Sequence, residues 1–346
     1  MSDPLNTGTA DRPLVSVIVP NYNYAASLGL CLRAILDQTY DRIELIVVDD
    51  GSTDNSVEIA RSLGVTVLHT PRNLGVAGAR NLGIARSNGE ICFFVDSDVA
   101  LAPDAVAHAV RLLQDDPGLG GVCGIHDPEP LIRDSLVEEY RGLQYHYWSA
   151  SSAGFISFLF PASCAIRRTV LDEVGPFNER LRHTEEVDYG NRLTQRHRLL
   201  LTPLIRSRHD HDAVLVPLLR KLFRRAHARV PLYVGRRKFA RGFETSSRAG
   251  GSLAALASLA LLPVALLSGY ALIAVVLALG VSLGTDAGMY RFVAQRRGWI
   301  FAAYFTAVHW VVNVTIAAGA LAGAAHWLGS PRFRRLYDAP VPEAVG

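Results

Sequence analysis

Short apolar runs alternate with amphipathic segments through the first 115 residues of this 346-residue chain. Runs rich in β-branched and aromatic residues predict buried strands at 14–20, 43–48, 65–69 and 91–95. Apolar residues at helical spacing predict helices at 27–37, 56–63 and 103–114, and a glycine-rich loop runs into a further helix at 73–87. Because these connections are too long for hairpins, the alternation predicts an α/β domain with a doubly wound, mostly parallel sheet.

Pairs of carboxylates follow two of the predicted strands. Asp49 and Asp50 end the second strand, and Asp96 and Asp98 end the fourth. Open α/β sheets bind their ligands at the carboxyl ends of the strands. Mg²⁺ and Mn²⁺ take oxygen ligands and leave positions for phosphate oxygens, so the Asp-x-Asp pair predicts a divalent metal that bridges a diphosphate. The alternative is that Asp98 only caps the helix that follows.

A glycine-rich stretch from Asn73 to Asn81 lies between these two acidic pairs. Its small residues would let the backbone approach a diphosphate, and the guanidinium of Arg80 suits the same ligand. The stretch follows the third predicted strand and lacks the GxGxxG spacing, which argues against a Rossmann dehydrogenase. The alternative for Arg80 is a solvated charge on the surface of a helix.

The pattern is less regular beyond residue 115. It predicts a strand at 119–124 and strand pieces at 155–160 and 163–167, and it assigns no element to the aromatic-rich stretch at 140–148. A third acidic cluster stands at the head of a predicted helix and consists of Glu185, Glu186 and Asp188. A carboxylate at a helix N-terminus stays ionised, as a general base requires. The alternative is that these acids only cap the helix.

Composition narrows the classes of function. The net charge is only +3 at pH 7, which argues against nucleic acid as a partner. The four cysteines lack CxxC spacing and predict buried thiols in a reducing compartment. The polar residues 1–12 lack the apolar core of a signal peptide, so we expect a disordered N-terminus and a domain at 13–212 that stays in the cytoplasm.

Basic residues gather in the last third of the chain. Residues 220–241 contain nine Lys or Arg and no acid, interleaved with apolar residues. This pattern predicts basic amphipathic helices at 213–248 that lie on an anionic membrane leaflet, in preference to an RNA-binding arm.

Two uncharged runs follow, at 249–285 and 298–331. Each exceeds the length that one helix needs to cross a bilayer of about 30 Å. Pro263 and Ser268-Gly269 favour a helical hairpin in the first run, whereas the second run is typical of a single span. The positive-inside rule places the flanking arginines in the cytoplasm, which requires an even number of spans in each run. For the second run this rule and the length of the run disagree, so the expected number of spans within 249–331 stays at two to four, followed by a tail at 332–346.

Three polar side chains interrupt the second run, and we expect them to pair helices with one another. They are His309, Asn313 and His326.

With these motifs in order, the chain resembles the family 2 glycosyltransferases, which have the GT-A fold, over about residues 14–230. The resemblance rests on Val-Ile-Val-Pro-Asn-Tyr-Asn at 17–23, Val-Val-Asp-Asp-Gly-Ser-Thr-Asp at 47–54, the glycine-rich segment at 73–81 and Asp-Ser-Asp at 96–98. It implies that a group of residues binds the nucleotide sugar, namely Pro20, Tyr22, Asp49, Asp50, Asn73, Arg80 and Asp96.

The resemblance also implies a metal site and a general base. Asp98 would hold Mg²⁺ or Mn²⁺, Asp96 would support the metal or the ribose, and His209 matches the family's histidine better than His211. Glu186 stands where the family usually has the catalytic Asp, which leaves the base open among Glu186, Glu185 and Asp188.

The implied protein is a membrane-bound, metal-dependent, inverting transferase with a cytoplasmic catalytic domain. It would move one sugar from a nucleoside-diphosphate sugar to a lipid or lipid-linked acceptor. The Gln-x-x-Arg-Trp element of processive synthases is missing, because Gln195-Arg196-His197-Arg198-Leu199 has no Trp. The alternatives are a nucleotidyltransferase on a related fold and a non-catalytic sugar-nucleotide-binding membrane partner.

Overall fold

The computed structural model describes residues 12–236 and 245–338. The expected disorder at 1–12, residues 237–241 of the basic cluster and the end of the tail lie outside the described residues, apart from Arg12 itself. The chain divides into two compact units. The first contains residues 1–132 and 153–210, and the rest of the chain forms the second.

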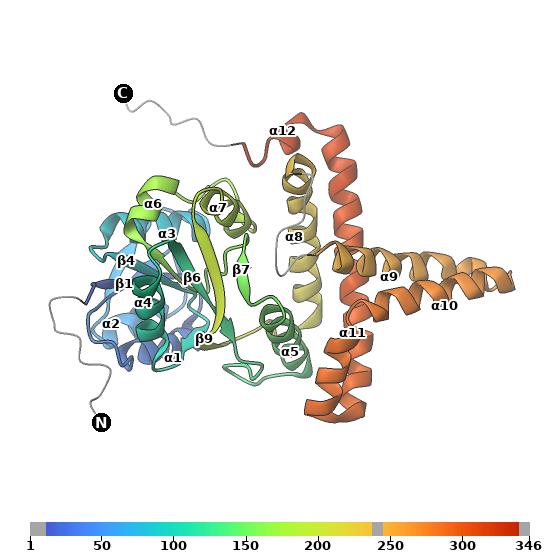
Figure 1. Cartoon of the computed structure of the whole chain (residues 1–346), viewed down its shortest axis with the longest axis horizontal. Coiled ribbons are helices and arrows are strands. Elements are labelled where there is room, and N and C mark those ends of the chain that lie inside the picture. Colours follow the sequence, from blue (N-terminus) through green and yellow to red (C-terminus); the bar gives the residue numbers. More distant parts are fainter. Residues whose placement is uncertain (1–11, 237–244, 339–346) are drawn as a thin grey trace. The chain divides into compact units, whose positions relative to one another are not determined.

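A sheet of nine strands forms the centre of the first unit, in the order β3-β2-β1-β4-β8-β6-β9-β5, with β7 paired to β9 (Figure 1). The strands are β1 (Val15–Asn21), β2 (Ile43–Asp49), β3 (Thr66–His69), β4 (Ile91–Val95), β5 (Val99–Leu101), β6 (Leu119–His126), β7 (Gly154–Ile156), β8 (Ser163–Arg167) and β9 (Arg198–His209). Strands β3, β2, β1 and β4 are parallel neighbours, and β8 joins antiparallel. The predicted α/β fold with a mostly parallel sheet is confirmed.

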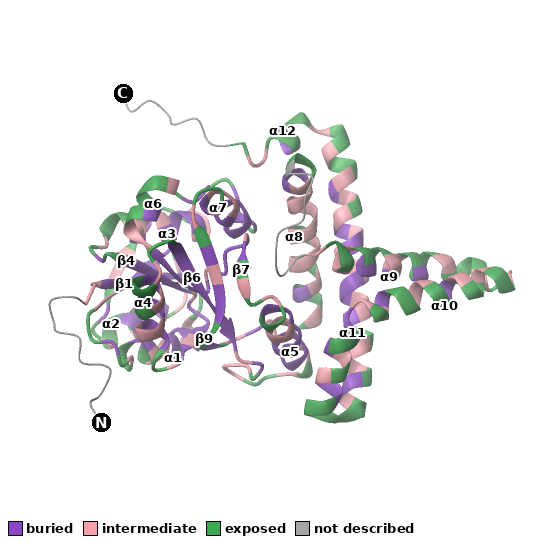
Figure 2. Cartoon of the chain, viewed as in Figure 1, coloured by how far each residue is buried: buried purple, intermediate pink, exposed green. Residues whose placement is uncertain are grey.

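Helices cover both faces of this sheet. They are α1 (Ala25–Leu36), α2 (Ser56–Ser62), α3 (Gly75–Arg86), α4 (Ala105–Asp115), α6 (Arg168–Val174) and α7 (Glu185–Leu193). The buried side chains of α1 and α4 share one core cluster with Val17 and Phe93 (Figure 2). Successive strand residues point to opposite faces, and α3 accordingly packs on the other face, where Gly83 lies against Ile18 and Val48.

One predicted strand is shorter than expected. The piece predicted at 155–160 pairs with β9 only over Gly154–Ile156. The rings of Phe158 and Phe160 instead pack edge to face, with centroids 5.0 Å apart, in a buried loop. Pro161 restricts the backbone of the residue before it, which favours such a loop over a continued ladder.

The described part of the second unit consists of helices. They are α5 (Leu136–Ala150), α8 (Leu215–Arg236), α9 (Ser246–Ala265), α10 (Gly269–Gly284), α11 (Ala287–Gly329) and α12 (Pro331–Arg334). The first uncharged run forms the predicted hairpin, α9 and α10. α11 carries a non-helical residue, Gly298, at which the helix kinks. Gly319 and Gly323 of α11 lie against the backbone of Phe223 and His227, so α8 packs closely along α11.

The aromatic-rich stretch at 140–148 belongs to α5 and packs in the second unit. The hydroxyl of Ser135 accepts a hydrogen bond from the backbone N–H of Glu138 and caps this helix. Tyr140, Leu143 and Trp148 then join a core cluster with side chains of α8 and α11.

A buried polar network lies within this core. The carboxylate of Asp286 accepts a hydrogen bond from Trp148 Nε1 at 3.1 Å and lies 3.3 Å from His309 Nε2 and 3.6 Å from Arg248 Nε. The other ring nitrogen of His309, Nδ1, lies 2.9 Å from the hydroxyl of Tyr140. Each of these polar groups thereby has a partner in place of the water that it loses on burial.

The three polar side chains predicted to pair helices do so. His309 joins α11 to α5, Asn313 accepts a hydrogen bond from Ser252 of α9, and His326 lies 3.2 Å from His227 of α8. Polar side chains in apolar runs therefore fix the packing partners of α11.

Asp286→Ala is expected to destabilise the full chain by about 2–4 kcal/mol. The change leaves a half-buried arginine, an indole N–H and a buried histidine without their shared acceptor. Thermal unfolding in detergent measures the effect. Asp134→Ala, at an exposed acid of the same unit, is the control, and equal unfolding temperatures for the two variants would contradict the network's contribution.

Candidate active site

Three parallel strands end at the same edge of the sheet. Asn21, the last residue of β1, lies directly opposite Asp49, the last residue of β2. On the other side of β1, β4 ends one residue before Asp96. Pro20 is buried within β1 and Tyr22 is exposed just beyond its end. The predicted nucleotide-binding residues of these strands thus lie on adjacent strand ends.

The carboxylate of Asp49 is buried and held in place by its neighbours. It accepts hydrogen bonds from Asn21 Nδ2 at 3.1 Å and from the backbone N–H of Ser52 at 3.2 Å. His69 Nδ1 lies 3.5 Å from Oδ2 of Asp49, the oxygen that accepts from Ser52. These contacts hold the loop after β1 and the loop after β2 together at this edge of the sheet.

The carboxylate of Asp50 supports the glycine-rich turn. It accepts hydrogen bonds from the hydroxyl of Thr70 at 2.8 Å and from the backbone N–H groups of Leu74 at 2.8 Å and Gly75 at 2.7 Å. The amide of Asn73 donates to the backbone carbonyl of Asp50 at 3.1 Å. An acid at these N–H groups complements the N-terminus of α3, so Asp50 shapes the turn.

Arg80 connects two of the three acidic clusters. Its guanidinium donates to Asp96 and to Glu185, both at 2.9 Å, and lies over the ring of Phe177. Its side chain is 2% exposed, so the alternative of a solvated surface charge is wrong. Burial alone would lower the pKa of Arg80, but the two carboxylates outweigh burial and the pKa is raised. The guanidinium therefore remains charged and fixes the end of β4 to the head of α7.

The third acidic cluster occupies the first turn of α7, as predicted. Glu185 pairs with Arg80, and Asp188 pairs with Arg192 at 2.9 Å. Arg192 also donates to the backbone carbonyls at 174 and 176. Glu186 lies between these two ion-paired acids and is 7% exposed. Two of the three candidates for the base thus hold arginines.

Close packing fixes the position of α7. A Cβ on Gly190 would lie 2.6 Å from the backbone nitrogen of Leu159, so only glycine permits this approach. The ring of Tyr189 stacks on Phe177 with centroids 4.0 Å apart. The packing of Tyr189 and Gly190 therefore holds the acidic first turn of α7 in place.

The second aspartate of the Asp-x-Asp pair lies beside the predicted histidine. Strands β5 and β9 pair antiparallel with Val99 opposite His209. This register brings His209 Nε2 to 3.7 Å from the nearer carboxylate oxygen of Asp98. His126, which the sequence reasoning missed, lies against His209 with ring centroids 5.1 Å apart.

The donors of this pair fit a divalent metal. Carboxylate oxygen and imidazole nitrogen are ligands that Mn²⁺ accepts, and Asp96 adds a carboxylate that is 31% exposed. Mg²⁺ commonly binds through one or two carboxylates together with water and substrate phosphates. Within the described residues no group of three or more His, Cys, Asp or Glu side chains is arranged to hold a metal ion by itself.

One buried thiol, that of Cys31, lies next to the site and donates to the backbone carbonyl of Asp96. All four cysteines are buried and free, as predicted. Burial, together with the carboxylates of Asp98 and Asp96, raises the pKa of Cys31, so its thiol stays protonated.

Sequence reasoning also missed residues that support the site. Arg182 donates to the side-chain oxygen of Asn73 at 3.0 Å, which braces the glycine-rich turn from 109 residues away. Phe177 supports Arg80 as described above. Arg192, which supports Asp188, was not missed, because its i,i+4 spacing from Asp188 is visible in the sequence.

The strand order and the acidic strand ends define a class of α/β domain that binds nucleotides at the carboxyl edge of its sheet. The model of the family described as glycosyl transferase family 2 matches residues 16–175. This part of the chain is therefore similar to the family 2 glycosyltransferases, and the architecture of the first unit is the GT-A fold.

Curated relatives match the same part of the chain. An uncharacterized glycosyltransferase of Haemophilus influenzae is 42% identical over 108 residues, which cover 30% of this chain and 43% of the relative. Glycosyltransferase GlyG of Streptococcus pneumoniae is 32% identical over 180 residues, which cover 46% of this chain and 59% of the relative. The chain thus spans about half the length of these curated relatives.

A solved structure resembles a larger part of the chain. The mannosyltransferase PcManGT of Pyrobaculum calidifontis, in complex with GDP-Man and Mn²⁺, superposes with a TM-score of 0.56 and 22% identity. The match covers 92% of this chain and 87% of that one. At this identity the likeness establishes the fold.

Proposed function

We propose that this protein is a membrane-bound, metal-dependent, inverting glycosyltransferase. It would move one sugar from a nucleoside-diphosphate sugar to a lipid or lipid-linked acceptor at the cytoplasmic face of a membrane. The observation that carries the proposal is the double ion pair of Arg80, which joins the end of β4 to the head of α7. Donor binding and acceptor activation would thereby share one rigid site.

The donor would bind along the carboxyl edge of β1, β2 and β4. Asp49, held by Asn21 and Ser52, would receive the nucleoside, and the exposed ring of Tyr22 would flank it. Asp96 would bind the ribose or the metal. The solved mannosyltransferase that shares the fold holds a nucleotide sugar and Mn²⁺, which supports this assignment.

Asp98, His209 and Asp96 would hold the divalent metal. When bound, the metal would act as a Lewis acid that stabilises negative charge on the leaving diphosphate. Arg80 is a positioning residue in this scheme, because its charge holds Asp96 and Glu185 in place.

Glu186 would act as the general base. Its carboxylate would take the proton of the acceptor hydroxyl while the hydroxyl oxygen attacks the anomeric carbon and the bond to the diphosphate breaks. Attack opposite the leaving group inverts the configuration. Glu186 is preferred over its two neighbours for this step because it stands where the family usually has the catalytic Asp.

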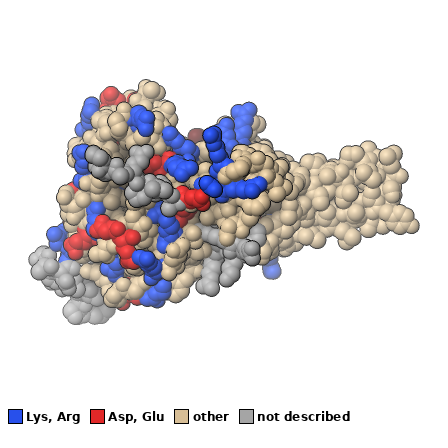
Figure 3. Space-filling view, turned by 90° about the horizontal axis from the view of Figure 1, so that it is seen from above, with Lys and Arg blue, Asp and Glu red and all other residues tan. Residues whose placement is uncertain are grey.

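The second unit would attach the protein to the membrane. Within the described residues, α9 and α11 are long and apolar enough to cross a bilayer. The hairpin of α9 and α10 carries no charge beyond residue 248, and Leu266, Leu267 and Tyr270 at its tip are almost fully exposed (Figure 3). Such a surface suits the interior of a bilayer. We place the hairpin in the bilayer and the basic helix α8 on its anionic cytoplasmic surface.

A donor screen tests the proposed reaction. The full chain is incubated with Mn²⁺, extracted membrane lipids and each of several nucleotide sugars, and release of nucleoside diphosphate is followed. We expect release with one donor only and a new glycolipid in the same sample. Pyrophosphate release from a nucleotide and a sugar phosphate would instead identify the nucleotidyltransferase alternative, and no turnover with any donor would favour a non-catalytic binder.

A further inference from the structure

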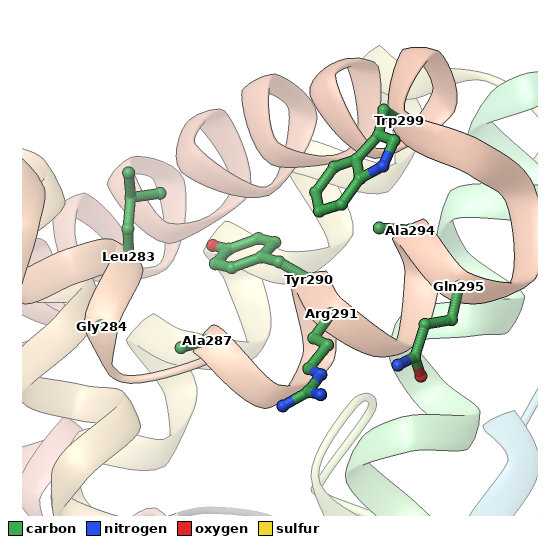
Figure 4. A pocket seen from close by; sticks show the side chains of 8 residues that line it. All are labelled: Leu283, Gly284, Ala287, Tyr290, Arg291, Ala294, Gln295 and Trp299. Atoms are coloured by element: carbon green, nitrogen blue, oxygen red, sulfur yellow. The ribbon is translucent and has the colours of Figure 1, made fainter.

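The second unit contains a cavity of about 750 Å³ at the junction of α10 and α11. Its volume lies in the range that holds small molecules and lipid segments. The residues of its lining that matter here are Leu283, Ala287, Tyr290, Arg291, Ala294 and Trp299 (Figure 4).

Most of the cavity wall is apolar. The rings of Tyr290 and Trp299 and the side chain of Leu283 border its inner part (Figure 4). Trp299 directly follows the kink of α11 at Gly298, and it is 81% exposed. A large exposed indole beside a sequence of apolar residues is typical of the boundary between a bilayer and water. An apolar chain therefore suits this part of the cavity.

A single cation stands at the edge of the cavity. Arg291, Arg296 and Arg297 separate the two uncharged runs. Arg297 forms an ion pair with Glu139, and Arg296 lies over the ring of Phe292. The guanidinium of Arg291 is exposed, and among the described residues it has no hydrogen-bond or ion-pair partner. It extends from the side of α11 away from Trp299 (Figure 4).

The cavity thus has an apolar interior and one unpaired positive charge at its rim. It lies where α10 leaves the uncharged hairpin, since Leu283 is in the last turn of α10 and Ala287 begins α11. An amphiphile with an apolar chain and an anionic head would match both features.

We propose that this cavity binds one anionic glycerophospholipid from the surrounding membrane. An acyl chain lies against Tyr290 and Trp299, and the phosphate accepts hydrogen bonds from the guanidinium of Arg291. The proposal rests on the membrane attachment proposed above, and it adds a defined lipid site at the base of the hairpin. It requires no contribution from the catalytic residues.

Native mass spectrometry of the full chain tests this site. The protein is assembled in nanodiscs of phosphatidylcholine that contain a minor share of phosphatidylglycerol, and retained lipids are counted after release. We expect one retained phosphatidylglycerol in the unaltered chain. Arg291→Gln is expected to lower this retention by about fivefold, as loss of one cation near an anionic headgroup predicts, whereas Arg291→Lys retains most of it.

Two further variants test separately the volume of the cavity and the position of the positive charge. Ala287→Trp fills the cavity from an exposed position and is expected to lower retention of phosphatidylglycerol although Arg291 is unchanged. Arg332→Gln removes an exposed arginine outside the cavity lining and is expected to leave retention unchanged.

Membrane association is measured in the same variants by alkaline extraction. A chain that stays in the membrane while Arg291→Gln and Arg332→Gln retain phosphatidylglycerol equally would overturn the lipid site alone. Retention of a neutral lipid or of a polyprenyl phosphate in place of phosphatidylglycerol would also overturn it. A chain that alkaline treatment releases from the membrane would overturn the proposed attachment and the site together.

Discussion

Glu186→Gln is expected to lower turnover by about a hundredfold to ten-thousandfold, the usual cost of losing a general base. Glu186 lies in the first turn of α7 between two acids that hold arginines. Glutamine has nearly the same shape but accepts no proton, so the fold and the affinity for the donor should change little. Steady-state release of nucleoside diphosphate and donor binding by calorimetry measure the two effects separately.

Two comparisons make this result specific. Glu58→Gln, at an exposed acid of α2, is the matched control and should leave turnover unchanged. Glu186→Asp keeps a carboxylate and should retain part of the activity. Full turnover in Glu186→Gln together with its loss in Asp188→Asn, at an unchanged unfolding temperature, would transfer the role of base to Asp188.

Asp98→Ala is expected to reduce turnover by about a hundredfold to a thousandfold. A bound metal contributes several kcal/mol of charge stabilisation, and each 1.36 kcal/mol is a factor of ten in rate. Asp98 lies in the loop between β4 and β5, beside His209, and it would be the principal ligand. Titration with MnCl₂, read by turnover and by the paramagnetic signal of free Mn²⁺, should show weakened metal binding.

The control for this variant is Asp115→Ala, which removes an exposed acid at the end of α4. It should match the unaltered chain in both turnover and metal binding. Undiminished turnover of the unaltered chain in excess chelator, or of Asp98→Ala under any condition, would contradict a metal-dependent reaction.

The strands of the first part of the fold could be predicted from the sequence because each of them is an apolar run of its own. The residues of β1 and β4 are entirely buried, so their sequences are mostly apolar, apart from Ser16 and Asn21 of β1. The polar residues that follow each run mark the edge at which ligands bind. Local pattern and tertiary position therefore agree in this part of the chain.

Two elements, β9 and α5, were not predicted from the hydrophobic pattern, for physical reasons. The long strand β9 contains Pro203, which argues against a strand, and its pairing with β6 accommodates the proline through a shift of register. The helix α5 has many aromatic and polar residues on its buried face. Its capping box at Ser135 and Glu138 was present in the sequence and was the one usable signal.

The sequence predicted that the candidate site residues lie at strand ends. It did not predict which side chains they pair with. Arg80 binds Glu185 across 105 residues and Asp96 across 16. A guanidinium suits a diphosphate and a carboxylate equally well, so the sequence alone could not show that two acids take it. Likewise, the sequence alone did not show that Arg192 holds Asp188.

The placement of α5 has a consequence for the order in which the chain matures. Tyr140 precedes its partner His309 by 169 residues, so at about 5–20 residues per second a ribosome adds His309 roughly 8–34 s after Tyr140. Throughout that interval α5 exists without the helix that completes its core. The hairpin of α9 and α10 emerges first, and the second unit closes only when α11 arrives, which makes nascent α5 a natural client for chaperones.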